Sequence, residues 1–432
     1  MPKALRASEH AGPGELPEIL LRGVRAPAGM PLLFDDDGRF LREVHLFLLD
    51  RLVRRRGASS SVHTLWAYAD DLSVWWSFLD ANEGRWDEIH DATIHDFVAV
   101  LTSAVSPITG RTYAPSTILR RIQTVLMFYE WAAGEGCAHV HGNVTRWGPN
   151  RFVNADKLTL AHVMRKAPKS RSLVKLKQVD PADRVNILST EQLRKVLRRL
   201  GPDLTHGQFD QSTSIRNRLI AEWALYTGMR LHEVLGLTKA QVLSLSLGCE
   251  GAHPAKLIKL RLVVTKGGRK RDVLAPAFLL RASQHYIDTE RSSVLKTARH
   301  RNGNYREPAQ LFLNSEDTNV AYVGKPLAGK VASRHFSAAV MGCGYIDEID
   351  TSKGVRRTAR FRYHDLRHTF AVRTYVELEA AGKHEPWKTI QTLLGHRFLS
   401  TTINTYLKHV RIDEVAVGDA LGRHIRMIAD AA

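Results

Sequence analysis

Apolar residues recur at intervals of three and four through much of the first 136 positions, the spacing of one face of an α-helix. The stretch GRFLREVHLFLLDRLVRRRG (38–57) predicts one such helix. In VHTLWAYADDLSVWWSFLDAN, which starts at residue 62, the apolar face consists of Leu65, Leu72, Trp76 and Leu79. Further helical patterns cover residues 93–105 and 114–136. We therefore expect a small bundle of about four helices over residues 62–136.

The predicted bundle is rich in aromatic side chains. They are Trp66, Trp75, Trp76, Phe128, Tyr129 and Trp131. Base-stacking platforms also use aromatic residues, but aromatics within amphipathic helices are more often core residues. We interpret these six as packing residues of the bundle.

After residue 136 the helical pattern is interrupted twice, first by a segment without periodicity and later by predicted strands. Periodicity fades over residues 137–187 and returns in ILSTEQLRKVLRRLG, whose Ser-Thr-Glu favours a helix start. In AKLIKLRLVVTKGGRKRDVLAP (255–276), alternating residues flank Lys-Gly-Gly, which is typical of a β-hairpin. AQLFLN (309–314) predicts a third strand, and helices resume after it. The predicted fold is mainly α with a small antiparallel β-sheet.

Charge points to a polyanionic partner. The 432 residues include 62 lysines and arginines but only 44 aspartates and glutamates, which gives a net charge of +18. Such an excess favours nucleic acid or an anionic membrane surface. The three cysteines are far apart, no stretch is apolar enough to span a bilayer, and the N-terminus lacks a signal peptide's apolar segment. We expect a cytoplasmic protein, associated with the nucleoid when bound to DNA, and no membrane partner.

Two short motifs in the second half place basic residues beside glycines. LYTGMRLHEVLGL (225–237) sets Arg230 and Glu233 three residues apart on one helical face, an ordinary ion pair when taken alone. TKGGRKR, at the tip of the predicted hairpin, contains Lys266 with Lys270 nearby. Neither motif identifies a function by itself.

Two more motifs contain histidines. YHDLRHTFA (363–371) places His364 and Arg367 on one face of a helix. His364 and His368 could chelate a metal ion, but the glutamate of a zinc-protease H-E-x-x-H motif is absent, so we expect no metal. LGHRFLSTTINTY places Tyr406 ten residues after His396, and we expect a Ser-Thr-Thr turn to join the two helices that carry them.

Together and in this order, the four motifs resemble the tyrosine recombinase (phage integrase) family. The resemblance covers roughly residues 188–410, while residues 60–136 are similar to the family's SAM-like core-binding domain by position and pattern only. In many members the tyrosine lies nine residues after the histidine, one fewer than here. The expected organisation is an N-terminal extension (1–59), a helical DNA-binding domain (60–140), a basic linker (141–187) and a catalytic domain (188–432).

The resemblance implies a C-shaped, two-domain DNA clamp that cuts and rejoins DNA through a 3′-phosphotyrosyl intermediate. It implies the following roles: Tyr406 as nucleophile, Arg230 and Arg367 neutralising the transition state, Lys266 as proton donor to the leaving oxygen, His364 as proton shuttle, His396 as a phosphate ligand and Glu233 as support. No cofactor or metal is expected, because these groups supply the charge that metal ions supply in other enzymes. Strand exchange in this family uses a homotetramer on paired recombination sites.

Basic residues outside the motifs are the expected contacts to DNA phosphates. RKAPKSRSLVKLK, in the predicted linker, contains six basic residues and no acid. The expected DNA-binding residues are Arg165, Lys166, Lys169, Arg171, Arg269 and Lys270. Accessory directionality proteins or a partner recombinase are possible further partners.

Two other functions remain open from the residues alone. A type IB topoisomerase shares phosphotyrosine chemistry but relaxes DNA without a defined site, and a relative that has lost catalysis could serve as a DNA-binding accessory factor. The separate helical bundle and the complete set of polar residues favour the site-specific recombinase. The sequence names neither the target DNA nor the biological setting, whether prophage, transposon, integrative element or chromosome resolution. It also gives no role for residues 1–59 or the segments around 298–309 and 347–362.

Overall fold

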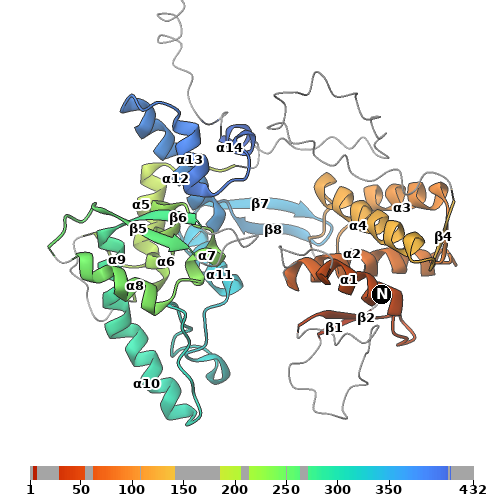
Figure 1. Cartoon of the computed structure of the whole chain (residues 1–432), viewed down its shortest axis with the longest axis horizontal. Coiled ribbons are helices and arrows are strands. Elements are labelled where there is room, and N and C mark those ends of the chain that lie inside the picture. Colours follow the sequence, from red (N-terminus) through yellow and green to blue (C-terminus); the bar gives the residue numbers. More distant parts are fainter. Residues whose placement is uncertain are drawn as a thin grey trace, which may run out of the picture. The chain divides into compact units, whose positions relative to one another are not determined.

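The computed structural model of the chain divides into two compact units, which are described separately (Figure 1). The first comprises Met1–Val179 with Asp350–Gly354, and the second comprises Asp180–Ile349 with Val355–Ala432. The structure describes residues 3–6, 29–53, 62–107, 109–141, 185–205, 214–249, 251–262, 271–406 and 409. Within this part, no helix is both long enough and apolar enough to cross a lipid bilayer.

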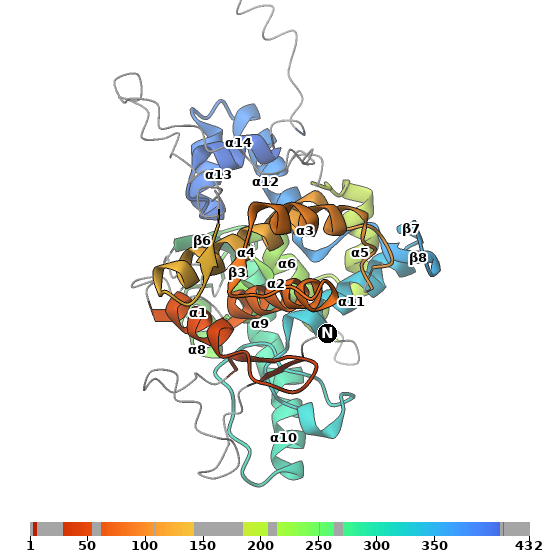
Figure 2. The same cartoon turned by 90° about the vertical axis from the view of Figure 1, so that its right-hand side faces the viewer.

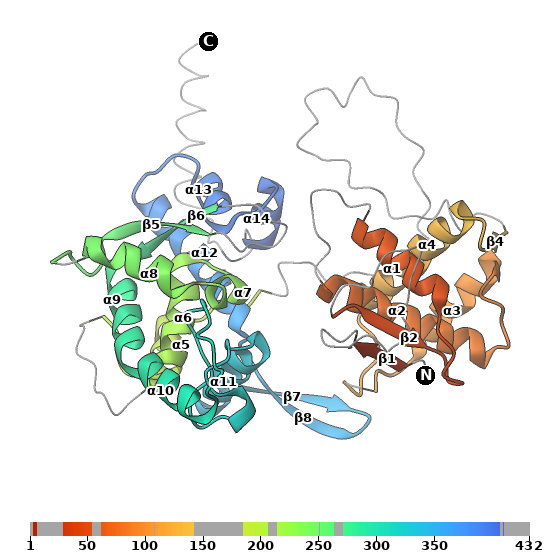
Figure 3. The same ribbon diagram turned by 60° about the horizontal axis from the view of Figure 1, so that its bottom comes forward.

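The first unit is a helical bundle with two small pairs of strands (Figure 3). Its elements are β1 (Lys3–Arg6), β2 (Pro31–Phe34), α1 (Arg42–Val53), α2 (Val62–Ala81), β3 (Glu88–Ile89), α3 (Asp91–Ser103), α4 (Pro115–Gly134) and β4 (His139–Val140). Strands β1 and β2 pair antiparallel, whereas β3 and β4 pair in parallel. Residues from all four helices form one hydrophobic core.

Aromatic rings fill the centre of this core, as the sequence predicts. Trp75 is fully buried, packs edge-on against Phe97 with ring centroids 4.9 Å apart, and donates a 3.0 Å hydrogen bond to the Tyr129 hydroxyl. Trp76, Phe128 and Trp131 are buried as well. Trp66 is only partly buried, and its indole N–H bonds to the Gly29 carbonyl. The interpretation of these residues as packing residues is confirmed for all but Trp66.

Helix α1 belongs to the same core, although the sequence assigned it to the N-terminal extension. Val44, Phe47 and Leu48 of α1 are fully buried and pack in the cluster that contains Trp75. Only three helices lie between residues 62 and 136, and α1 is the fourth helix of the bundle. The predicted boundary at residue 59 therefore cuts through this core.

His45 joins β2 to α1 inside the core. Its Nε2 accepts a 2.8 Å hydrogen bond from the Leu33 backbone N–H, and its Nδ1 donates to the Leu41 carbonyl at 2.6 Å. This pattern uses one nitrogen as acceptor and the other as donor, so it requires the neutral imidazole. Burial lowers the pKa of His45 to about 4, against an opposing effect of the bond to Leu41.

The second unit is built around α6 (Arg216–Thr227), whose residues are buried on nearly every side. The remaining helices are α5 (Thr190–Leu200), α7 (Leu231–Leu235), α8 (Lys239–Ser246), α9 (Ala277–Tyr286), α10 (Ser292–Arg301), α11 (Gly329–Gly342), α12 (Tyr363–Ala380), α13 (Pro386–Leu394) and α14 (Leu399–Tyr406). Short 3₁₀ turns cover Leu247–Cys249 and Val320–Tyr322, and a π-helical turn at Ile287–Arg291 joins α9 to α10. The strands are β5 (Leu257–Leu262), β6 (Arg271–Pro276), β7 (Ile346–Thr351) and β8 (Gly354–Ala359). The predicted fold class, mainly α with small antiparallel sheets, is confirmed.

The hairpin predicted around Lys-Gly-Gly is present as β5 and β6, which pair antiparallel with Leu257 opposite Pro276. The third strand predicted at AQLFLN (309–314) is wrong, because that segment forms only isolated bridges. The carbonyls that would pair with a neighbouring strand instead accept hydrogen bonds from the buried guanidinium of Arg291. The accepting carbonyls belong to Pro308, Gln310 and Leu311. The long segment near residue 350 folds as the separate β7–β8 ribbon (Figure 1).

Acid should destabilise the first unit through His45. An unfolded histidine titrates near pH 6.5, whereas His45 in the fold titrates near 4. Below about pH 6.5 the unfolded chain binds a proton that the folded chain does not, so stability is lost as the pH falls from 6.5 towards 4. Between pH 7.5 and pH 5 we expect His45 to contribute a loss of about 2 kcal/mol. Asp71, whose pKa burial raises to about 6, opposes part of this loss, so the difference between the wild type and His45→Gln isolates the effect of His45. Urea titrations followed by tryptophan fluorescence measure it.

The non-titrating variant His45→Gln should be less stable at pH 7.5 but should lose much less stability on acidification. His63→Ala, which removes an exposed histidine of α2, is the matched control and should keep the wild-type pH dependence. An acid loss in His45→Gln as large as in the wild type would assign the effect to another group.

Candidate active site

The second unit brings together polar residues from four separate stretches of sequence. Arg230 lies immediately before α7, His364 and Arg367 lie in α12, His396 follows α13, and Tyr406 ends α14. Helices α12, α13 and α14 pack against one another and lie together in both views of the molecule (Figures 1 and 2). The site is therefore assembled by tertiary packing and does not belong to one local motif.

Arg367 is the buried centre of this arrangement, with 1 % of its surface exposed. One terminal nitrogen donates to the Gly228 carbonyl, and the other donates to the Leu394 carbonyl at 2.7 Å. Gly228 ends α6 in the left-handed conformation, with φ of 66°. A Cβ there would lie 2.6 Å from the Phe370 ring, so glycine is required for both the turn and the close packing. Burial, then the charges of other arginines, lowers the pKa of Arg367 to about 9, so it stays protonated at neutral pH.

Glu233 holds two more arginines in place. Its carboxylate accepts from the Arg230 backbone N–H at 2.8 Å, from the Arg230 side chain at 3.2 Å and from Arg271 at 2.6 Å. Arg271, the first residue of β6, also donates to the Leu393 carbonyl. Burial opposes ionisation of Glu233, but Arg271 and Arg230 outweigh it and lower the pKa. Arg230 keeps about a quarter of its side chain exposed (23 %), so it can contact a ligand.

Tyr406 is held by a histidine of α12. Its hydroxyl lies 3.0 Å from Nδ1 of His368, and its ring is 1 % exposed. Burial raises the pKa of Tyr406 to about 12, against the opposing charges of Arg367 and Arg230. The tyrosine is therefore protonated at neutral pH, and its hydroxyl donates to Nδ1 of His368 in the neutral tautomer that carries the ring proton on Nε2.

The histidines of the site are neutral at neutral pH. Burial, together with nearby positive charge, lowers the pKa of His364 to about 4 and those of His368 and His396 to about 3. Each neutral ring has one nitrogen that can accept a proton. The site thus combines fixed cations with proton acceptors beside a protonated tyrosine.

The Ser-Thr-Thr cluster is not the turn that the sequence predicts, because residues 400–402 lie inside α14. Thr402 is fully buried, and its hydroxyl lies 2.9 Å from Nδ1 of His396. The turn is made by Gly395, in the left-handed conformation at the end of α13. The threonine orients the imidazole, and the glycine redirects the chain.

The electrostatic balance of the site favours an anion. Arg230, Arg271 and Arg367 bring three positive charges, and Glu233 compensates one of them. The hydrogen bonds that Arg367 makes within the described part go to two neutral carbonyls. Guanidinium groups bind the oxygens of phosphate through short, charge-assisted hydrogen bonds. A phosphate diester is the ligand that this arrangement suits.

The structure brings together six of the residues that the sequence selects. They are Arg230, Glu233, His364, Arg367, His396 and Tyr406. Lys266, Arg269 and Lys270 of the hairpin tip, and Arg165, Lys166, Lys169 and Arg171 of the predicted linker, lie outside the described residues. Tyr363 and Tyr375, read as packing residues, are buried.

Two residues of the site, Arg271 and His368, were not predicted from the sequence in these positions. Arg271 follows the hairpin tip, and its pairing with a carboxylate 38 positions earlier gives no local signal. His368 was considered only as a metal ligand with His364. Its signal was available, because positions 364 and 368 fall on the same face of the helix that carries Arg367.

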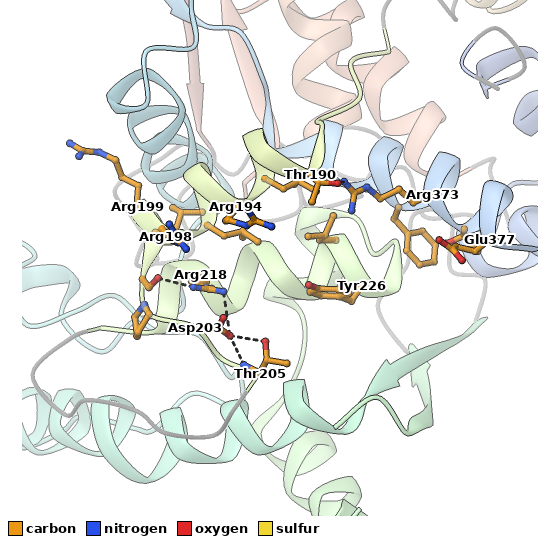
Figure 4. A pocket seen from close by; sticks show the side chains of 18 of the residues that line it. Thr190, Arg194, Arg198, Arg199, Asp203, Thr205, Arg218, Tyr226, Arg373 and Glu377 are labelled. Carbon is orange, nitrogen blue, oxygen red and sulfur yellow. Dashed lines mark hydrogen bonds and ion pairs between the residues drawn. The ribbon is translucent and has the colours of Figure 1, made fainter. Parts of the chain in front are cut away.

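A separate cavity of about 1220 Å³ lies between α5, α6 and α12 (Figure 4). Arg194, Arg198, Tyr226 and Arg373 are among its lining residues, and Arg218 lies within 3.6 Å of Asp203. None of the six assembled site residues lines it. The cavity is thus distinct from the cluster of candidate active-site residues.

Two protein-family models match the sequence of this chain. The model of the phage integrase family matches residues 188–411, and the model of the phage integrase N-terminal SAM-like domain matches residues 48–136. The chain therefore belongs to the phage integrase family. It is a tyrosine-type site-specific recombinase.

Curated relatives and solved structures show how far the similarity extends. Tyrosine recombinase XerC of Roseiflexus sp. (strain RS-1) is 26 % identical over 353 residues, covering 81 % of this chain and 85 % of the relative. Tyrosine recombinase XerC of Herpetosiphon aurantiacus is 25 % identical over 359 residues, covering 82 % and 89 %. The XerH recombinase bound to its palindromic difH substrate aligns over 83 % of this chain and 79 % of its own, with a TM-score of 0.46 and 16 % identity. The Tn1549 transposon integrase in complex with circular intermediate DNA aligns over 88 % and 99 %, with a TM-score of 0.47 and 15 % identity.

Removing the carboxylate of Glu233 should destabilise the second unit. Glu233→Ala leaves Arg271, whose side chain is 9 % exposed, without its partner, and breaking a buried ion pair costs about 3 kcal/mol or more. Glu385→Ala, which breaks an exposed pair with Lys388, is the control and should change stability by less than about 1 kcal/mol. Chemical denaturation compares the two, and equal losses would contradict the supporting role of Glu233.

Proposed function

We propose that this recombinase cuts and rejoins DNA at specific sites with Tyr406 as the nucleophile, through a 3′-phosphotyrosyl intermediate. One observation carries the proposal: the Tyr406 hydroxyl is hydrogen-bonded to His368, in a site where guanidinium groups outnumber carboxylates. A phenol becomes a strong nucleophile only when its proton is taken up by a base. His368 is the neutral base in contact with it.

The first chemical step forms one bond and breaks another at the same phosphorus. The Tyr406 oxygen attacks the phosphate, its proton passes to Nδ1 of His368, and the bond from phosphorus to the 5′ oxygen breaks. Negative charge concentrates on the non-bridging oxygens in the transition state. Arg230 and Arg367 neutralise it, and a single such donor contributes about 3–4 kcal/mol in comparable oxyanion sites.

The leaving 5′ oxygen needs a proton, and we assign its donation to Lys266 of the hairpin between β5 and β6. His364 and His396 provide further hydrogen bonds to the phosphate or relay protons. The covalent phosphotyrosine conserves the energy of the broken bond, so a 5′ hydroxyl of another strand can attack it and reverse the step without a cofactor.

The charge of the chain supports DNA as the partner. A net charge of +18 provides the non-specific attraction to phosphates that positions a duplex. We assign part of this contact to the basic residues of the predicted linker and hairpin tip. We further propose strand exchange by four copies of the chain on two sites, since each tyrosine can break only one of the four strands.

Tyr406→Phe should abolish covalent attachment to DNA while leaving DNA binding intact, because it removes the attacking oxygen and keeps the ring. The DNA that flanks the gene is first sequenced to find short inverted repeats, and the assay then uses a duplex with these repeats, nicked near the cleavage point so that the adduct is trapped. Denaturing electrophoresis detects the adduct, and a gel shift measures binding. Tyr375→Phe is the control and should form adduct normally. An adduct that persists in Tyr406→Phe would overturn the assignment of the nucleophile.

His368→Ala should slow adduct formation by about 10²- to 10⁴-fold, the usual contribution of a positioned general base. His300→Ala, which removes an exposed histidine of α10, is the control for loss of an imidazole from the second unit. Single-turnover measurements on the nicked substrate separate this effect from DNA affinity. A rate within twofold of the wild type would exclude His368 as the base and return that role to His364.

A further inference from the structure

Histidine and glutamate side chains gather on the first unit, whereas the candidate active-site residues belong to the second. Strands β3 and β4 pair in parallel, with Glu88 opposite His139 and Ile89 opposite Val140. The His141 backbone N–H extends this pairing with a 2.8 Å bond to the Ile89 carbonyl. The pairing therefore fixes the backbone of two segments that are fifty residues apart in sequence.

Alternation along the strands turns the polar side chains outward together. Ile89 is fully buried and packs in the hydrophobic core, and Val140 packs against that core. Since successive side chains of a strand point to opposite faces, Glu88 and His90 emerge on the other face, as does His141. All three are exposed.

The donor atoms of Glu88, His90 and His141 lie within 4.8 Å of one another. Nε2 of His141 is already 3.6 Å from the Glu88 carboxylate, and the rings of His90 and His141 lie parallel with centroids 4.5 Å apart. Ligands at 2.0–2.1 Å around a tetrahedral ion are separated by about 3.3–3.4 Å. The strand pairing has already placed the three backbones, so side-chain rotation is the movement that a bound ion would require.

We propose that Glu88, His90 and His141 form a binding site for a divalent transition-metal ion, with zinc as the preferred physiological ion. Two imidazoles and one carboxylate are a frequent zinc donor set, whereas magnesium and calcium prefer oxygen ligands alone. Water completes the coordination at this exposed position.

The site would link three elements of the first unit. Glu88 belongs to β3, His90 immediately precedes α3, and His141 immediately follows β4. The strand pair itself is only two residues long, so its backbone hydrogen bonds are few. A bound ion adds a cross-link between these ends and stabilises the folded unit in proportion to the logarithm of ion concentration over Kd.

Calorimetric titration of the chelator-treated full-length protein with zinc chloride tests the site. The wild type should bind one zinc ion at this site, and His90→Ala and His141→Ala should each weaken that binding at least tenfold. Because both residues are exposed, the variants should keep the wild-type circular dichroism spectrum. His63→Ala removes another exposed histidine of the same unit and should bind zinc as the wild type does.

Thermal unfolding gives a second measurement. Zinc should raise the unfolding midpoint of the wild type and of His63→Ala, and it should not raise that of His141→Ala. Magnesium at the same concentration should have no effect on the wild type. Zinc affinity that is unchanged in both His90→Ala and His141→Ala, or the absence of stoichiometric binding to the wild type, would overturn the proposal.

Discussion

The site depends on one buried cation that is held by the ends of two helices. The carbonyls that bond to Arg367 belong to Gly228, which caps α6, and Leu394, the last residue of α13. The final carbonyls of a helix have no partner within it, and the negative end of the helix dipole attracts a cation there. A charged group that would be costly to bury alone thus joins three helices, since Arg367 itself lies in α12.

This constraint contributes to the protonation of the neighbouring residues. Burial lowers the pKa values of the nearby histidines, and the positive charge of Arg367 lowers them further, so these rings stay neutral and retain their acceptor nitrogens. The same field partly opposes the effect of burial on Tyr406. In the proposed reaction, the negative charge of the phosphate would compensate the arginines, so that the histidines could accept a proton at a lower cost. Ligand binding and proton transfer would then be coupled through Arg367.

Features set by local spacing could be predicted from the sequence, whereas features set by tertiary contact could not. The helical face shared by His364 and Arg367 and the hairpin around Lys-Gly-Gly follow from the periods of helix and strand. The segment at 309–314 has the composition of a strand, but its carbonyls are bonded by Arg291, whose position no local pattern reveals. Thr402 was predicted to lie in a turn. Its hydrogen bond to His396 joins two separate elements, so no local pattern in the sequence reveals it. The spacing of apolar residues predicted the position of α1, but it did not show that α1 packs in the core of the helical bundle.

The π-helical turn at Ile287–Arg291 has a consequence for how this chain tolerates changes in length. A π-helical turn contains one residue more than the α-helical turn that it replaces, so it absorbs the extra residue while the helix beyond it keeps nearly the same angular phase. Arg291 ends the turn with its guanidinium aimed at the carbonyls of the segment that follows α10. Losing one residue from this turn would restore an unbroken α-helix from α9 to α10, whereas losing one elsewhere in either helix would rotate the residues beyond it by about 100°. The irregular turn is thus the place in this segment where a change of one residue disturbs the direction of α10 least, and the main constraint on it is the position of Arg291.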